Sequence, residues 1–215
     1  VLVKEAGAPR LLMSSRSGQV QRGSEADLEW LAACGAAVRC VRSDASDASE
    51  VRRLMHALSG GDWRLGGVFH AAGVLADALL AGQSAQRFCT VYGPKVHGAV
   101  ALHRAAALAP VSSFLVYSSV ASLLGSTGQA PHSAANSWLD AFAYWRRSTC
   151  GVGQGLQWGA VAEIGYAARH GADARAERSG TGAITRAMAY EALRCALSPH
   201  WMLAAILPID WPRLL

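Results

Sequence analysis

The stretch SFLVYSSVASLLGSTGQAPHSAAN, residues 113–136, decides the fold class of this sequence. It opens with a short apolar run that ends at Ser118 and Ser119, and it leads into a segment with helical spacing. The apolar run predicts a buried strand at residues 113–118, and the later periodicity predicts a helix at residues 133–147. Strands that alternate with helices of this length are typical of parallel crossovers. The stretch therefore indicates one unit of an α/β fold.

The same alternation continues on both sides of this stretch. Apolar runs predict further strands at residues 10–14, 37–41, 67–70, 155–158 and 202–207, and helical periods predict helices at residues 25–34, 48–58, 94–107 and 185–197. Ser24 and the pair Ser46 and Asp47 are expected to cap the first two helices, because their side chains can accept from first-turn amides. We expect a single domain, residues 1–215, with a doubly wound parallel sheet and ligands beyond the carboxyl ends of its strands.

The composition excludes several classes of protein. Of the 215 residues, 52% are hydrophobic and 16% charged, and no apolar run reaches the roughly 18 residues of a membrane span, so we expect a globular chain without one. The net charge is +5, but the basic residues are scattered rather than clustered, which disfavours a nucleic-acid partner. The five cysteines lack metal-ligand spacing, which predicts no metal site and the reduced, mostly buried thiols of a cytoplasmic protein.

Residues 159–182 stand apart from the regular alternation. This segment has several glycines and alanines and no clean period. Long loops inside compact domains are usually functional, so we expect an active-site lid here.

The ends of the first two predicted strands carry candidate cofactor-binding residues. Ser15 and Arg16 follow the first strand, where a guanidinium suits a 2′-phosphate and favours NADPH over NADH. A surface arginine is the alternative interpretation of Arg16. Asp44 and Ala45 follow the second strand, where the carboxylate is suited either to an adenine amino group or to capping the next helix.

The third strand end offers small residues beside a histidine. His70 is followed by Ala71, Ala72 and Gly73, which permit close approach of the backbone to a flat cofactor. A tight turn and a histidine with satisfied hydrogen bonds in the core are the alternatives.

Candidate catalytic residues follow the fourth strand. Ser119 ends that strand, and His132 and Asn136 are one helical turn apart, so both side chains can converge on Ser119. Lys95 precedes them, on the predicted helix at residues 94–107.

The order of these motifs resembles the ketoreductase domain of modular polyketide synthases and related fatty acid synthases, a branch of the short-chain dehydrogenase/reductase family. The resemblance covers essentially the whole chain. It implies a Rossmann-like fold and an NADPH-dependent reduction of a β-ketoacyl group on an acyl carrier protein, beside neighbouring synthase domains. The motifs that carry it are Arg16, Asp44, residues 70–73, Pro94-Lys95-Val96, Tyr117-Ser118-Ser119, Gly128-Gln129-Ala130, Asn136 and Gln157-Trp158-Gly159.

The resemblance also implies catalytic roles. In that family a serine and a tyrosine hydrogen-bond the substrate carbonyl, and a lysine and an asparagine hold the tyrosine and the nicotinamide ribose. Ser119, Lys95 and Asn136 match three of these positions, whereas His132 stands at the position of the tyrosine. Imidazole is mostly neutral at physiological pH, more so beside Lys95, and its ring is shorter than a phenol. A catalytically silent structural domain is therefore the alternative to a reductase.

Two further departures bear on the resemblance. Family members open with a strand and a glycine-rich turn that holds the pyrophosphate, and the sequence from Val1 contains neither, so we expect an N-terminally incomplete domain that lacks them. Asn136 occupies the place where free-standing reductases of this family usually carry a lysine, which disfavours a free-standing enzyme.

Overall fold

The structure is a computed structural model that describes residues 1–4, 6–20, 23–59, 64–107, 109–162, 180–198 and 200–214. Its strands are β1 (Arg10–Ser15), β2 (Ala37–Arg42), β3 (Gly67–His70), β4 (Ser113–Ser119), β5 (Gln154–Trp158) and β6 (Leu203–Ile206). Its helices are α1 (Glu25–Ala33), α2 (Ala48–Ser59), α3 (Ala85–Tyr92), α4 (Gly98–Ala105), α5 (Ala121–Leu124), α6 (Ala130–Cys150), α9 (Arg186–Ala196) and α10 (Trp211–Leu214), with a 3₁₀ turn η1 (Leu80–Gly82) and a π-helical segment η2 (Gly93–His97).

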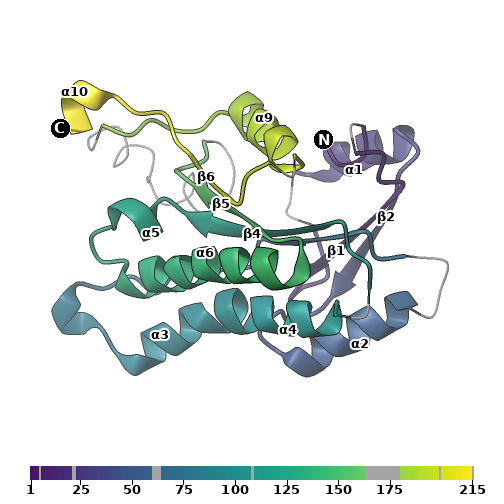
Figure 1. Ribbon diagram of the computed structural model, residues 1–215, viewed down its shortest axis with the longest axis horizontal. Helices are drawn as coiled ribbons and strands as arrows, with labels where there is room; N and C mark the ends of the chain where they lie inside the picture. Colours follow the sequence, from purple (N-terminus) through teal and green to yellow (C-terminus); the bar gives the residue numbers. More distant parts are fainter. Residues whose placement is uncertain are drawn as a thin grey trace.

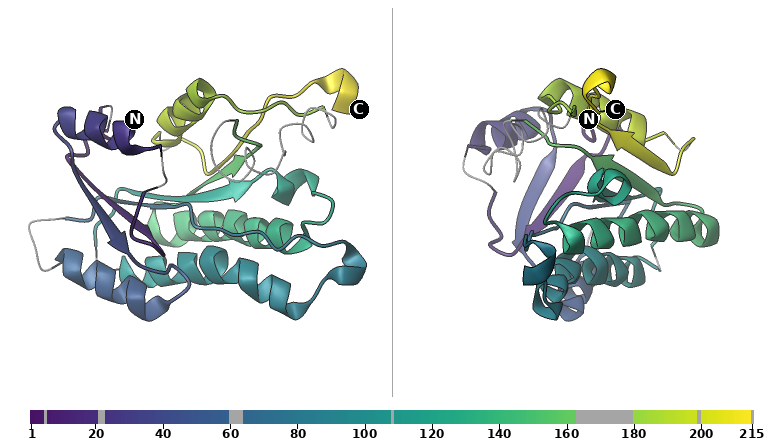
Figure 2. Two further views of the ribbon diagram at one scale, coloured as in Figure 1. Left: turned by 180° about the vertical axis from the view of Figure 1, so that it is seen from behind. Right: turned by 90° about the vertical axis from the view of Figure 1, so that its left-hand side faces the viewer.

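Helices cover both faces of the strands. The helices α2, α3, α4 and α6 form a layer on one side, and α1 and α9 lie on the other (Figure 1). The views from behind and from the side show the same arrangement (Figure 2). All strand pairs are parallel, so the predicted α/β class is confirmed.

The strands form two sheets rather than one. β1 pairs with β2, and a second sheet has the order β3-β4-β5-β6. In a doubly wound sheet the first strand lies between two such halves, with the second and third strands on one side and the fourth onward on the other. The division between β1 and β3 is the arrangement expected of a Rossmann-like fold whose described strands lack that first strand.

The helices differ from the sequence prediction in several places, and the short helices α5 and α10 were not expected. The helix α3 was not expected, and it continues through η2 into α4, because Pro94 occupies the start of a π-helical turn instead of the start of a helix. The helix α6 begins at Ala130, ahead of the expected start, since proline is well suited to a first helical turn. Ser24 makes no capping bond to α1, whereas Asp47 caps α2 by accepting from Ser49 N at 2.7 Å.

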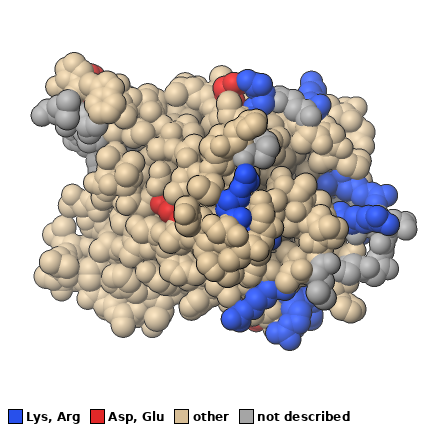
Figure 3. Space-filling model, in the orientation of Figure 1, with Lys and Arg blue, Asp and Glu red and all other residues tan. Residues whose placement is uncertain are grey.

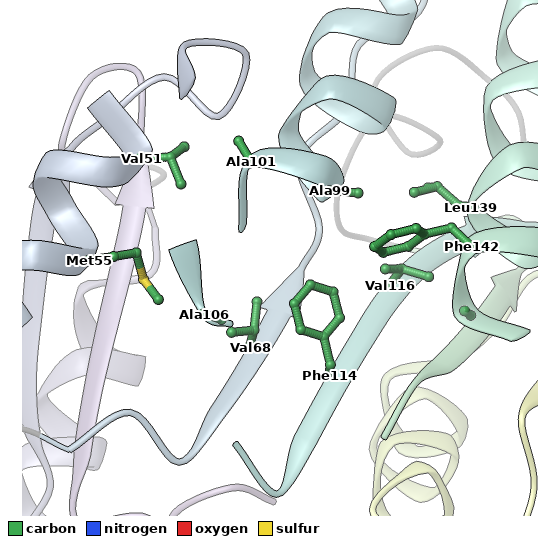
Figure 4. Packing of buried hydrophobic residues seen from close by; sticks show 11 residues of the cluster. Val51, Met55, Val68, Ala99, Ala101, Ala106, Phe114, Val116, Leu139 and Phe142 are labelled. Carbon is green, nitrogen blue, oxygen red and sulfur yellow. The ribbon is translucent and has the colours of Figure 1, made fainter. Parts of the chain in front are cut away.

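The largest hydrophobic core lies between the second sheet and the layer of α2, α4 and α6 (Figure 4). Phe114 and Val116 of β4 pack there against Ala99 of α4 and Leu139 and Phe142 of α6. Phe114, Val116, Ala99 and Leu139 are at most 1% exposed. This packing fixes α6 against β4, whose carboxyl end leads to the candidate site.

The cysteines are free, but the expectation that they are mostly buried is wrong. Cys34 is half-buried, and the other four lie on solvent-facing sides or at the end of their elements: Cys40, Cys89, Cys150 and Cys195. Among the described helices, none is long and apolar enough to cross a membrane.

Most of the predicted lid, at residues 163–179, lies outside the described residues. The two ends of the segment are described. Ala162 N donates to Ile184 O at 2.9 Å, and Asp210 N donates to Gly180 O at 2.8 Å. These bonds tie both ends to the region that leads into α9 and follows β6.

Candidate active site

Lys95 is the buried centre of the candidate site. It lies in η2 and is 6% exposed. Its ammonium donates to Asn136 Oδ1 at 2.8 Å and to the carbonyl of Tyr117 at 3.2 Å. Burial lowers the pKa of Lys95 to about 8, against an opposing contribution from Asp140. Lys95 is therefore mostly an ammonium at neutral pH and is held between β4 and α6.

Asn136 connects helix α6 to Lys95 of η2 and to Ser118 of β4. Its side chain is fully buried; the amide oxygen accepts from Lys95 and the amide nitrogen donates to His132 O at 2.8 Å. Ser118 Oγ of β4 donates to Asn136 O at 3.2 Å. The structure thus brings Lys95, Asn136 and the backbone of His132 together at the carboxyl end of β4. The convergence of the His132 and Asn136 side chains on Ser119 stays a prediction.

His132 is a half-buried imidazole in the first turns of α6. Burial, reinforced by the positive charge of Lys95 and opposed by Asp77, lowers the pKa of His132 to about 4. Its Nδ1 is buried without a hydrogen-bond partner among the described residues. The ring is therefore neutral at physiological pH, and its Nδ1 makes no hydrogen bond to the part of the chain that the structure describes.

Ser119 ends β4 and begins the turn into α5. Its Oγ accepts from Ala121 N at 3.2 Å. A hydroxyl that accepts one bond keeps its own proton available for a further acceptor. Ser119 is thus able to donate a hydrogen bond to a carbonyl oxygen beyond the end of β4.

The predicted cofactor residues after β1 and β2 lie in tight loops. Gly18 N donates to Ser15 Oγ at 3.1 Å, and the Arg16 carbonyl accepts from Arg42 Nε at 3.2 Å. The Arg16 side chain is exposed, and its guanidinium makes no hydrogen bond or ion pair with the described residues. Asp44 Oδ1 accepts from Ser46 N at 2.8 Å. This contact closes a turn and does not cap the next helix, because Asp47 is the residue that caps α2.

The loop after β2 reaches the third strand end. A Cβ on Gly98, at the start of α4, would meet both Ala45 O at 3.1 Å and His70 Cε1 at 3.0 Å, so these three residues are closely packed. His70 is 3% exposed, and its Nε2 lies 3.0 Å from the Lys95 carbonyl. Since a carbonyl only accepts, Nε2 carries the proton, and burial lowers the pKa of His70 to about 4. His70 is therefore a buried residue whose hydrogen bond holds the Lys95 backbone in place.

Gly73, in the loop of small residues after His70, lies directly against the Lys95 side chain. A Cβ on Gly73 would lie 3.0 Å from Lys95 Cε and 3.5 Å from its Nζ. Ala71 and Gly73 are exposed, and Ala72 is half-buried. The absence of a side chain at residue 73 therefore lets the backbone of this loop pack directly against Lys95.

On the face of the molecule that Figure 3 shows, the basic side chains are unevenly distributed. Figure 3 shows them toward the side of β1, β2 and α2, whereas the opposite end, with α3, α5 and α10, carries little charge. Arg16 directly follows β1, and its side chain is exposed.

Sequence reasoning missed a polar cluster beneath the turn that follows Ser119. Asp140 of α6 is 9% exposed and accepts from Ser122 of α5 and Gln157 of β5. The available signal was the position of Asp140 one helical turn after Asn136, on the same face of α6.

Comparisons with known proteins agree with this geometry. A family model described as the KR domain matches residues 1–163. The polyketide synthase GfsB of Streptomyces halstedii is 37% identical over 208 residues, which cover 96% of this chain and 4% of that protein. The phthioceranic/hydroxyphthioceranic acid synthase of Mycobacterium tuberculosis (strain ATCC 25618 / H37Rv) is 39% identical over 160 residues, 74% of this chain and 8% of that protein. The chain therefore spans less than a tenth of these curated relatives.

Solved structures show the same likeness. An A-type ketoreductase from a modular polyketide synthase has a TM-score of 0.86 and 32% identity, covering 96% of this chain and 44% of that chain. The ketoreductase from the first module of phoslactomycin biosynthesis in Streptomyces sp. HK803 has a TM-score of 0.88 and 28% identity, covering 99% of this chain and 49% of that chain. The family and the Rossmann-like fold predicted from the sequence are confirmed, and the chain belongs to the KR domain family, the ketoreductase domains of polyketide synthases.

Proposed function

We propose that the chain reduces a β-ketoacyl thioester, presented on an acyl carrier protein, to the β-hydroxyacyl thioester, with NADPH as the reductant. The proposed setting is a polyketide or fatty acid synthase in the cytoplasm, whose neighbouring domains are the proposed partners. The observation that carries the proposal is the buried Lys95–Asn136 pair at the carboxyl end of β4, beside Ser119 and His132. Membership of the ketoreductase family supports it.

The residues divide into a carbonyl-binding group and a cofactor-binding group. NADPH, when bound, supplies the hydride. The Ser119 hydroxyl and a ring N–H of His132 are suited to donate to the substrate carbonyl, where negative charge develops during reduction. Lys95 and Asn136 hold the base of that site together. The residues proposed for the cofactor are Ser15, Arg16, Asp44, Ala45, His70, Ala71, Ala72 and Gly73, with Arg16 for the 2′-phosphate.

One described feature favours a second candidate, a catalytically silent structural domain. The pKa of His132 is lowered to about 4, so little imidazolium is present at neutral pH to serve as a proton donor. General acid catalysis is typically worth about 10²–10⁴-fold in rate, and a neutral imidazole forfeits much of it. The two candidates differ in whether His132 sustains turnover.

The test measures NADPH oxidation with a β-ketoacyl thioester, using the full-length protein, its His132→Tyr variant and its Ser119→Ala variant as a matched control. Turnover by the unsubstituted protein, lost in Ser119→Ala, supports the reductase. Turnover only in His132→Tyr supports the silent domain. Turnover that Ser119→Ala leaves unchanged would show that the proposed carbonyl site is wrong.

The segment at residues 159–182 is proposed as a lid over this site. Its described ends lie beside β5 and β6, and Gly159 N donates to Ile206 O at 2.9 Å. A closed lid would exclude water and complete the site. Limited proteolysis of the segment should slow when NADPH and substrate are both present, and unchanged cleavage would contradict a closing lid.

A further inference from the structure

A buried polar cluster lies where α5, α6 and β5 meet. Asp140 Oδ2 accepts from Ser122 Oγ at 2.6 Å and from Gln157 Nε2 at 2.8 Å. Gln157 Nε2 also lies 3.1 Å from Ser122 Oγ. The cluster therefore ties three elements together through a single carboxylate.

The cluster also contacts the backbone of Ser119. Ser122 Oγ lies 2.7 Å from Ser119 O, so its hydroxyl proton is shared between that carbonyl and Asp140. The peptide that follows Ser119 is also held in place, because Val120 N donates to Trp158 O at 3.0 Å. The turn that presents the Ser119 hydroxyl thus rests on Asp140 through Ser122.

Asp140 is linked to Lys95 as well. Asp140 lies one helical turn after Asn136, the residue that accepts from the Lys95 ammonium, and both are buried. The charge of Asp140 raises the pKa of Lys95, in opposition to the larger effect of burial. A carboxylate at this place favours the charged form of the lysine.

The other titratable groups around Lys95 do not offer a negative charge at neutral pH. They come from three elements, His70 of β3, Tyr117 of β4 and His132 of α6. Burial lowers the pKa of both imidazoles to about 4 and raises the pKa of Tyr117 to about 12. All three are neutral at pH 7. Among the described acidic residues, Asp77 acts on His132, whereas the charge of Asp140 acts on Lys95.

We propose that Asp140 is a positioning residue of the ketoreductase site: through Ser122 its carboxylate holds the turn that carries Ser119, and from the next turn of α6 it acts on the Lys95–Asn136 pair. Its consequence for catalysis rests on the proposed function. The charge coupling to Lys95 stands on its own and is measurable without turnover.

The first experiment uses the two lysines of the chain, Lys4 and Lys95. With ¹³C-labelled lysine, each Cε gives one NMR signal, and Lys4 is exposed and serves as the internal reference. Asp140→Asn keeps the shape and the acceptor oxygen but removes the charge, so the Lys95 midpoint should fall by about one pH unit, a tenfold loss of proton affinity. Ser122→Ala, which keeps the charge, should leave the Lys95 midpoint in place. Equal midpoints in Asp140→Asn and the unsubstituted chain would overturn the proposal.

A measurement on the unsubstituted chain covers the case in which Asp140→Asn does not fold. The ¹³C signal of the Asp140 carboxyl carbon should shift at the Lys95 midpoint, because loss of the Lys95 positive charge changes the electric field at that carbon. An Asp140 signal that does not respond when Lys95 titrates would overturn the coupling without any substitution.

Turnover supplies the second experiment. Asp140→Asn should move the pH profile of kcat/KM by the same amount and in the same direction as the Lys95 midpoint. Ser122→Ala should lower kcat, through the loosened Ser119 turn, without moving the profile. A profile that Asp140→Asn leaves in place would overturn the catalytic role of Asp140. Coupling by NMR with no turnover in any variant would overturn the proposed function alone.

Discussion

Acidification should destabilise the fold through the buried imidazoles of His132 and His70. Burial lowers the pKa of both from 6.5 to about 4, and the charge of Lys95 adds to the effect. The folded chain keeps both rings neutral, while the unfolded chain binds protons near pH 6.5. Stability from these groups is therefore intact above pH 6.5 and is lost as the pH falls from there toward 4.

The size of the effect follows from the shift. A displacement of one pKa unit corresponds to about 1.4 kcal/mol, so a fall from 6.5 to about 4 amounts to about 3 kcal/mol for each histidine. The free energy of unfolding of a typical domain is about 5–15 kcal/mol. One of these protonations therefore removes a substantial part of it.

Urea unfolding, followed by tryptophan fluorescence at several pH values between about 7 and 4, isolates the contribution of His132. The comparison is between the unsubstituted chain and His132→Tyr, with His132→Gln as a second variant that lacks both the titration and the phenol. The difference in free energy of unfolding between the chain and either variant should change by about 3 kcal/mol across this range, in favour of the variants at low pH. A difference that stays constant with pH would refute the burial argument for His132.

Three further predictions concern single side chains. Asn136→Ala should lower the free energy of unfolding by about 2 kcal/mol in urea titrations, because it leaves the Lys95 ammonium without its side-chain partner; an unchanged midpoint would contradict it. Leu156→Ala, at a fully buried residue of β5, should cost about 2–5 kcal/mol in thermal unfolding, while Leu203→Ala, at a residue that is 40% exposed, should cost much less. Arg16→Ala should weaken NADPH binding by roughly tenfold or more and leave NADH binding nearly unchanged in a calorimetric titration, and equal losses for both would argue for a surface role.

The strands were predictable because each is a short apolar run, and the parallel class followed from the helices between them. β3, for example, lies at the predicted residues. The α3 helix and the π-helical turn were not predictable in the same way, because Gly93 and Pro94 are signals for a helix boundary. The structure instead runs α3, η2 and α4 together, with the proline at a position where its missing N–H is tolerated.

The candidate site residues divide along similar lines. The relation between His132 and Asn136 is a local spacing on one helix, which sequence reasoning reads directly. The contacts of Asp140 with Ser122 and Gln157 span 18 and 17 residues and join helix α6 to helix α5 and strand β5. Such contacts depend on how α5, α6 and β5 pack, and no local pattern encodes them. The position of Arg16 was predictable from its strand end, and its role stays a prediction.

The same lysine has opposite consequences for a tyrosine and for a histidine at residue 132. A phenol that gives up its proton becomes an anion, which the Lys95 ammonium stabilises, so a lysine here assists a tyrosine as a proton donor. An imidazole must first become a cation to act as a strong acid, and the Lys95 charge opposes that step in addition to burial. Asp140 sharpens the contrast, because by favouring the ammonium of Lys95 it would help the phenol and hinder the imidazolium. The electrostatics around residue 132 therefore suit a neutral group that loses a proton, and a histidine in this place acts through a neutral ring N–H or not at all.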